Sequence, residues 1–157
     1  PPVLGDHNGF EIYPMPFFAS MDTSNVTALV QWYQDALGFG VMFKGPEMNG
    51  QPVIVHLRRL KYQDILVRLA APGAEIRETS GLSLTFQSGE DVDALAARAM
   101  ATPVFGKTRV APPVDTPWNT RQLDVTDPDG RALAFSQPRF DPELTRRLQA
   151  MFDKDKE

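Results

Sequence analysis

The chain has 157 residues, of which 42% are hydrophobic and 23% are charged, and its formal net charge is −4. This length and composition predict one globular domain over residues 1–157, large enough to bury a single core. The acidic balance disfavours nucleic acid as a partner, because nucleic-acid-binding faces are basic. No apolar run approaches the ~20 residues that a membrane span needs. The absence of cysteine excludes disulfides and thiolate chemistry and favours a cytoplasmic location.

The first half of the chain predicts one helix set among strands. Residues 1–16 contain four prolines and little periodicity, so we expect an extended arm there. Apolar residues recur at helical spacing from Val26 to Leu37, behind three capping residues, and Gly38 is expected to end this helix. Strands are expected at residues 17–21, 40–44, 52–59 and 64–70, with a tight turn at Asn49-Gly50 and an end at Pro72-Gly73.

The second half repeats this order. A strand is expected at residues 81–87, and the capping-box-like segment 88–91 begins a helix whose apolar stripe is Val92, Leu95, Ala96 and Ala99. Further strands are expected at residues 104–110, 120–125 and 131–137, with a proline-rich link at 111–117 and a compact turn at 127–130. The sequence therefore predicts an α+β fold of two tandem βαβββ modules, residues 17–72 and 81–138.

The C-terminal segment, residues 139–157, predicts a further helix and a charged tail. Asp141 is a suitable cap, and Pro142 stands at the first helical position. The apolar stripe of this helix consists of Leu144, Leu148, Met151 and Phe152. We expect the helix to pack on the outside of a sheet or across a dimer, because an isolated helix of this length is marginal in water.

Two tandem βαβββ units resemble the vicinal-oxygen-chelate superfamily, which includes glyoxalase I, extradiol dioxygenases, fosfomycin-resistance enzymes and the bleomycin-resistance proteins. The motifs that carry the resemblance are Trp32-Tyr33-x-x-x-Leu37-Gly38-Phe39, Asp91-Val92-Asp93-Ala94-Leu95, and Pro117-Trp118-Asn119-Thr120-Arg121 followed by Asp127-Pro128-Asp129-Gly130. The resemblance covers about residues 17–138. It implies that the two modules form a curved mixed sheet shaped like a cup.

The resemblance also says where a metal ion would be held. Metal-dependent members place a His, Glu or Gln near the start of each module's first strand and a Glu or His in its last strand. The last-strand position of the second module falls at Ala134, whose methyl group cannot coordinate a cation, and the first-strand positions fall at residues 15–18 and 82–84, which hold no such residue. The resemblance therefore predicts no metal, no cofactor and no catalytic residue, as in the drug-binding branch.

Four residues are candidates for ligand binding, each with a structural alternative. Trp118 resembles the tryptophan that stacks on ligands in drug-binding relatives, but it would also suit the closed end of a core. Phe43 is a pocket aromatic or a core phenylalanine, and His56 points into the cup or is a hydrogen-bonded sheet histidine. Arg121 is a pocket donor or pairs with a turn carboxylate. Of the carboxylates, we expect only Asp64 and Asp124 to meet a cationic ligand.

Three functions compete on these observations, and one of them is a regulatory or interaction module in which the cup is vestigial. The first is sequestration of a bulky, partly aromatic or cationic small molecule such as an antibiotic, on a face that Ala132, Ala134 and Ser136 keep spacious. The alternative is a metal-dependent lyase, isomerase or dioxygenase of the same superfamily, with ligands relocated to His56 and carboxylates such as Asp64, Asp124 or Glu47. In each case we expect a homodimer, because open cups leave unpaired strand edges that proteins usually cover.

Overall fold

The computed structural model describes residues 12–154, and every structural statement below concerns these residues. The elements of the first half are β1 (Phe18–Thr23), α2 (Val26–Leu37), β2 (Gly40–Lys44), β3 (Glu47–Met48), β4 (Gln51–Pro52), β5 (Ile54–Arg58) and β6 (Asp64–Leu69). The elements of the second half are β7 (Ser83–Gln87), α3 (Val92–Ala101), β8 (Arg109–Val110), β9 (Val114–Asp115), β10 (Thr120–Thr126), β11 (Ala132–Pro138) and α4 (Pro142–Lys154). No helix in this part of the chain combines the length and the apolar character that crossing a bilayer requires.

The strands form two sheets of matching topology. The first sheet has the order β1-β6-β5-β2, and the second has the order β7-β11-β10-β8, with β9 also paired to β10. In each sheet the first and last strands of the repeat are parallel, β1 with β6 and β7 with β11, while the remaining pairs are antiparallel. The α+β fold with two repeated units is therefore confirmed.

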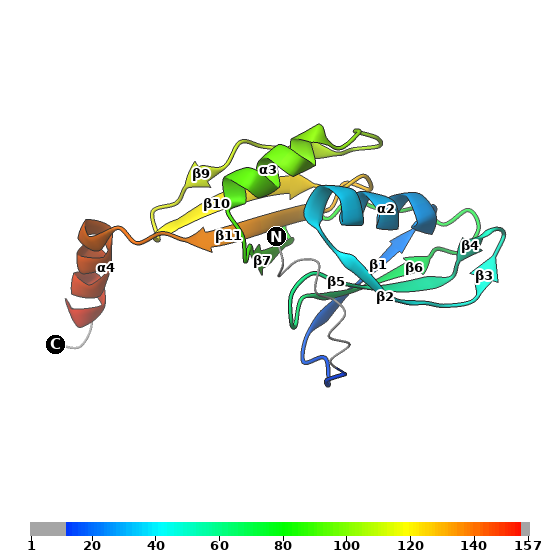
Figure 1. Ribbon diagram of the computed structural model, residues 1–157, viewed down its shortest axis with the longest axis horizontal. Helices are drawn as coiled ribbons and strands as arrows, with labels where there is room; N and C mark the ends of the chain where they lie inside the picture. The colour runs from blue at the N-terminus through cyan, green and yellow to red at the C-terminus, as the bar shows by residue number, and fades with distance from the viewer. Residues whose placement is uncertain (1–11, 155–157) are drawn as a thin grey trace.

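Helices α2 and α3 cover the same side of the two sheets and contact each other (Figure 1). The core lies between these layers and draws buried side chains from both repeats, among them Tyr33, Leu57, Ile65, Leu95 and Phe135. Burying one such side chain stabilises the fold by about 1.5–3 kcal/mol. Asn25 caps α2 by accepting a hydrogen bond from the Ala28 N–H at 3.0 Å. Gly38 ends α2 in the left-handed region, with φ at 74°, where glycine alone has no steric cost.

Buried polar contacts fasten the two repeats to each other. Asp127, in the turn between β10 and β11, accepts hydrogen bonds from the N–H groups of Asp129 and Arg131 and also from the Tyr33 hydroxyl of α2 at 2.9 Å. Arg59, after β5, is fully buried and donates to the carbonyl of Gln87 in β7 at 3.2 Å. Burial lowers the pKa of Arg59 to about 10, although Glu90 opposes this. The Asp-Pro-Asp-Gly turn therefore has a second role as an inter-repeat contact.

Three local expectations were wrong in detail. The strand predicted over residues 104–110 is limited to β8, because Gly106 turns the chain with φ at 57° and a side chain there would collide with the Pro128 carbonyl. The segment predicted as a plain proline-rich link contains β9, whose two residues pair with β10. The strand predicted over residues 52–59 is divided, because Gln51–Pro52 pair with Glu47–Met48 as a separate hairpin around the Asn49-Gly50 turn.

Helix α4 extends away from both sheets at the end of the second repeat (Figure 1). Its start is fixed by Asp141, whose carboxylate accepts from the Glu143 and Leu144 N–H groups, and by a hydrogen bond from the Asn119 side chain to the Thr145 hydroxyl at 2.9 Å. Met151 and Phe152 of the apolar stripe are 65% and 66% exposed. The helix was predicted correctly, but its stripe does not pack on the outside of its own sheets.

Candidate functional site

Each sheet has a face turned away from α2 and α3, which we call its open face. Side chains alternate between faces along a strand. Since Val55, Leu57, Ile65 and Val67 are buried in the core, their neighbours in β5 and β6 lie on the open face of the first sheet. By the same alternation, Leu133 and Phe135 place Ala132, Ala134 and Ser136 on the open face of the second sheet. The shared face predicted for these three small residues is therefore confirmed.

Asp64 is the centre of a cluster on the first open face. Its side chain is fully buried, and its Oδ1 atom lies 2.6 Å from His56 Nε2 and 2.7 Å from Arg58 Nε. The Tyr13 hydroxyl donates to Asp64 Oδ2 at 2.6 Å and accepts from the Tyr62 N–H at 2.8 Å. Burial, followed by the hydrogen bond to Asp64, raises the pKa of the Tyr13 phenol, so Tyr13 remains a donor. The carboxylate is thus fully engaged, and Asp64 has no exposed oxygen to offer a cationic ligand.

Phe43 and His56 are neighbours on this face. They are directly opposite each other in the β2–β5 pairing, which continues past a bulge between Val41 and Phe43. Residues opposite each other in an antiparallel pair present their side chains on one face. Phe43 is 58% exposed, so it is not the core phenylalanine that the sequence left as an alternative. His56 is hydrogen-bonded to Asp64, as the alternative interpretation of a sheet histidine requires.

Trp118 lies at the tip of the β9–β10 hairpin, beside Asn119, whose φ is 66°. It is 61% exposed, so its alternative role in closing a core is wrong for a single chain. Trp32, by contrast, is buried against Tyr33 with their ring centroids 5.2 Å apart, as expected for a structural pair. The exposed indole gives the end of the second sheet a large aromatic surface.

Arg121 does not lie on the open face. It is paired with Gln137, whereas the Asp124–Ala134 pair faces the open side. Arg121 and Asp124 are an odd number of positions apart in β10, so their side chains lie on opposite faces of the sheet. Its guanidinium binds both oxygens of Asp93 in α3 at 2.8 Å and Asp115 in β9 at 2.9 Å. These two carboxylates raise the pKa of Arg121 and are not the turn carboxylates that the sequence suggested. We therefore interpret Arg121 as a tie between the helix and the hairpin and leave it out of the proposed site.

The open-face positions where relatives hold metal ions contain weak or no ligands. Ala134 is paired with Thr85 across β11 and β7, just outside the predicted range of 82–84. The equivalent pair in the first repeat, aligned on the buried residues of β6, is Leu66 with Ser20. Methyl, isobutyl and hydroxyl groups are a poor set for a divalent cation. Within residues 12–154 no three His, Asp or Glu side chains gather in a way that would hold a metal ion.

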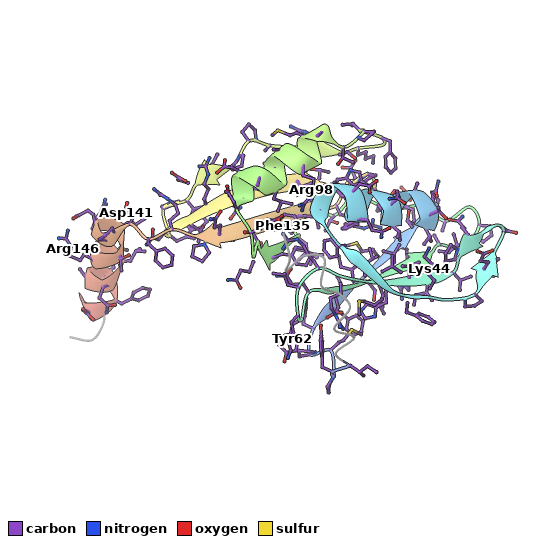
Figure 2. All side chains as sticks on the ribbon, viewed as in Figure 1. Lys44, Tyr62, Arg98, Phe135, Asp141 and Arg146 are labelled. Carbon is purple, nitrogen blue, oxygen red and sulfur yellow. The ribbon has the colours of Figure 1, made fainter. Side chains whose placement is uncertain are left out.

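The predicted ligand residues fall into two separate groups. Phe43 and His56 belong to the first sheet, whereas Trp118 is next to Asn119, which contacts α4 at the far end of the second sheet. Figure 2 shows this separation through the labelled residues Lys44 and Tyr62 on the first repeat and Asp141 directly before α4. A single chain therefore does not bring Phe43, His56 and Trp118 to one point.

Hollows lie at the seam of the two repeats and over the second sheet, and the one at the seam was not predicted from the sequence. A pair of adjoining cavities, about 330 and 270 Å³, lies between β1 and β7 at the seam of the two repeats, and both are lined by Phe17, Ala19, Leu82 and Leu84. A cavity of about 440 Å³ lies over the second sheet and is bordered by Ser83, Asp124 and Ala132. Asp124 is exposed there and accepts from the Gln122 amide at 2.9 Å. The available sequence signal for the seam was an apolar residue directly before each strand, Phe17 before β1 and Leu82 before β7.

Two repeated βαβββ units, each with one sheet face left uncovered by helices, define an α+β fold class. The sequence model of the Glyoxalase/Bleomycin resistance protein/Dioxygenase superfamily matches residues 20–135, and the chain belongs to this family. No curated protein sequence matches the chain.

Solved structures of similar fold include an antibiotic-binding protein, a bleomycin resistance determinant and the protein TioX. TnmS3, an antibiotic-binding protein from Streptomyces sp. CB03234, is 27% identical, with a TM-score of 0.53 over 77% of this chain and 93% of its own. The bleomycin resistance determinant encoded on transposon Tn5 is 18% identical, with a TM-score of 0.59 over 79% and 98%. TioX from Micromonospora sp. ML1 is 20% identical, with a TM-score of 0.58 over 78% and 97%.

Proposed function

We propose that this protein binds and sequesters a bulky, partly aromatic small molecule such as an antibiotic, without a metal ion or other cofactor. The observation that carries the proposal is the exposure of two aromatic side chains, Phe43 and Trp118, beside open faces whose central positions hold Ser20, Leu66, Thr85 and Ala134 instead of metal ligands. The similarity of fold to the bleomycin resistance determinant of Tn5 and to the antibiotic-binding protein TnmS3 supports the same class of ligand. A chain without cysteine suits the reducing cytoplasm, which is where we place this activity.

Aromatic stacking contributes to the affinity for such a ligand. A planar ligand on Trp118 or Phe43 gains roughly 0.5–1.5 kcal/mol per ring pair beyond the area that it buries. Burial of apolar ligand surface adds about 25 cal/mol per Å². The loss of translational and rotational freedom on binding offsets part of these two contributions, and only the surplus appears as affinity.

We propose a homodimer as the binding form. Phe43 and His56 lie far from Trp118 in one chain, so one ligand meets all three only if a second copy supplies Trp118. The exposed stripe of α4, beside the same hairpin, gives such a pairing apolar surface to bury. In a two-fold symmetric dimer, each chain supplies its Trp118 hairpin to the site of the other chain, so both sites are completed.

Intrinsic fluorescence tests the function. The protein is titrated with bleomycin, and separately with planar aromatic antibiotics, in the presence of a chelator. We expect saturable quenching in the wild type and none in Trp118→Phe, in which only the buried Trp32 emits. Binding that appears only after a divalent metal ion is added would contradict the proposal.

The metal-dependent alternative has one observation in its favour, the proximity of His56 and Asp64. However, Asp64 is already bound by Arg58 and Tyr13, and Asp124 belongs to the other sheet. A cation at this point would have to displace a guanidinium. Metal analysis of protein purified without chelator distinguishes the two functions, since a stoichiometric transition metal would favour the enzyme.

A further inference from the structure

The hydrogen bonds around Asp64 fix the chemistry of His56. Asp64 Oδ1 accepts from Arg58 Nε at 2.7 Å and lies 2.6 Å from His56 Nε2. A carboxylate only accepts hydrogen bonds, so the Nε2 atom of His56 carries a proton and donates. The orientation of an imidazole is commonly set in this way, by a carboxylate bound to one of its two nitrogens.

Asp64 has two described partners besides His56. The carboxylate of Asp64, buried from solvent, already has a positive partner in the Arg58 guanidinium, and the Tyr13 hydroxyl donates to its other oxygen. A neutral imidazole protonated on Nε2 has an unprotonated Nδ1, which is a hydrogen-bond acceptor.

We propose that His56 Nδ1 is a fixed acceptor in the binding site, and that the ligand carries a hydroxyl or N–H donor on the aromatic ring that stacks on Phe43. This inference rests on the proposed function and specifies its ligand class, namely phenols, aromatic amines and aromatic amides. The support is positional: Phe43 is opposite His56 in the sheet and exposed, and the His56 side chain retains 18% exposure on the same face. Among residues 12–154, the described bond of His56 is the one to Asp64.

Tyr13 makes the acceptor a rigid one. Its ring lies over the Arg58 guanidinium, 4.2 Å from the carbon to the ring centroid, and packs edge-on against Tyr62 at 4.8 Å. Arg58 is therefore covered although it lies on the open face. With Arg58 and Tyr13 both holding Asp64, the imidazole cannot rotate without breaking its bond to the carboxylate.

The first experiment reads the tautomer of His56 without any ligand. The chain has two histidines, His7 and His56, so His7→Gln leaves a single imidazole for nitrogen NMR. At neutral pH we expect a proton on Nε2 and none on Nδ1. An imidazolium, or a neutral ring with its proton on Nδ1, would overturn the inference.

The second experiment compares two probes that differ only in the donor, 2-naphthol and 2-methoxynaphthalene, by calorimetric titration. We expect the wild type to bind 2-naphthol about fivefold more tightly or better, the worth of one hydrogen bond. His56→Phe keeps an aromatic ring of similar size and should remove this preference, while the control Phe43→Leu should weaken both probes by the same factor. Thermal unfolding of each variant checks that it is folded.

The outcomes separate the two proposals. Equal affinity of the wild type for the two probes would overturn the inference about His56 and leave aromatic binding intact. If neither naphthalene binds but His56 has the expected tautomer, the acceptor is present and the proposed aromatic ligand is wrong. A preference for 2-naphthol that persists in His56→Phe would assign the acceptor to another residue and would also overturn the inference.

Discussion

Replacing Trp118 with alanine separates a ligand platform from a structural tryptophan. Trp118 is 61% exposed, so the substitution removes little buried surface and leaves no closed cavity. We expect it to cost about 1 kcal/mol of the free energy of unfolding, within the range of ordinary substitutions. For ligand binding we expect a loss of about 1–3 kcal/mol, combining stacking with buried area. That loss corresponds to roughly 5- to 150-fold in affinity.

The matched control is Trp32, which is 2% exposed and packs in the core. Trp32→Ala should destabilise the protein by about 3–5 kcal/mol through loss of buried surface and cavity formation. Trp118→Phe should retain part of the affinity, because a smaller aromatic face remains. The assays are denaturant unfolding and fluorescence-independent calorimetric titration on each variant. A collapse of stability in Trp118→Ala, or an unchanged affinity for the ligand, would refute the assignment of Trp118 to the site.

Three further predictions concern the fold and the assembly. The pKa of Tyr33 is raised well above its usual value, first by burial and then by Asp127, so its neutral form stabilises the fold fully below pH ~10 and this contribution is lost as the pH rises beyond. Tyr33→Phe should therefore reduce the loss of unfolding free energy above pH ~10, and an unaltered pH profile would count against the buried phenol. Arg59→Met should lower the unfolding free energy by roughly 3–5 kcal/mol, because Glu90, 7% exposed, loses one of its two arginine partners; equilibrium unfolding that matches the wild type would contradict this. Deleting residues 139–157 should convert a dimer into a monomer lighter than the full 17.5 kDa chain in sedimentation and lower the melting temperature by about 2–4 °C per kcal/mol lost. A full-length chain that already sediments as a monomer at micromolar concentration would refute the dimer.

The elements could be predicted because their signals are local. The helical spacing from Val26 to Leu37 and the Asp-Pro-Asp-Gly turn need only neighbouring residues to be recognised. The shortened strand β8 was missed because Gly106 turns against the Pro128 carbonyl, a contact between distant segments. Side chains alternate between faces along β10, and Leu123 and Val125 face the core, so Arg121 lies on the helix side as well. The same alternation in the sequence would have kept Arg121 out of the ligand pocket.

The candidate site was harder to predict, because its contacts join segments far apart in sequence. Tyr13 binds Asp64 across 51 positions, and nothing near either residue signals the pairing. Asp64 was expected to face a ligand as a free carboxylate, but it instead holds His56 and Arg58. The exposure of Trp118 depends on where the β9–β10 hairpin ends, which a sequence pattern does not determine.

Native mass spectrometry of the protein taken directly from its producing cells, without chelator, tests the central claim most directly. We predict a dimer of about twice 17.5 kDa that carries an organic small molecule and no stoichiometric metal ion. A transition metal ion bound at one per chain, on a protein that carries no organic ligand, would contradict metal-independent sequestration.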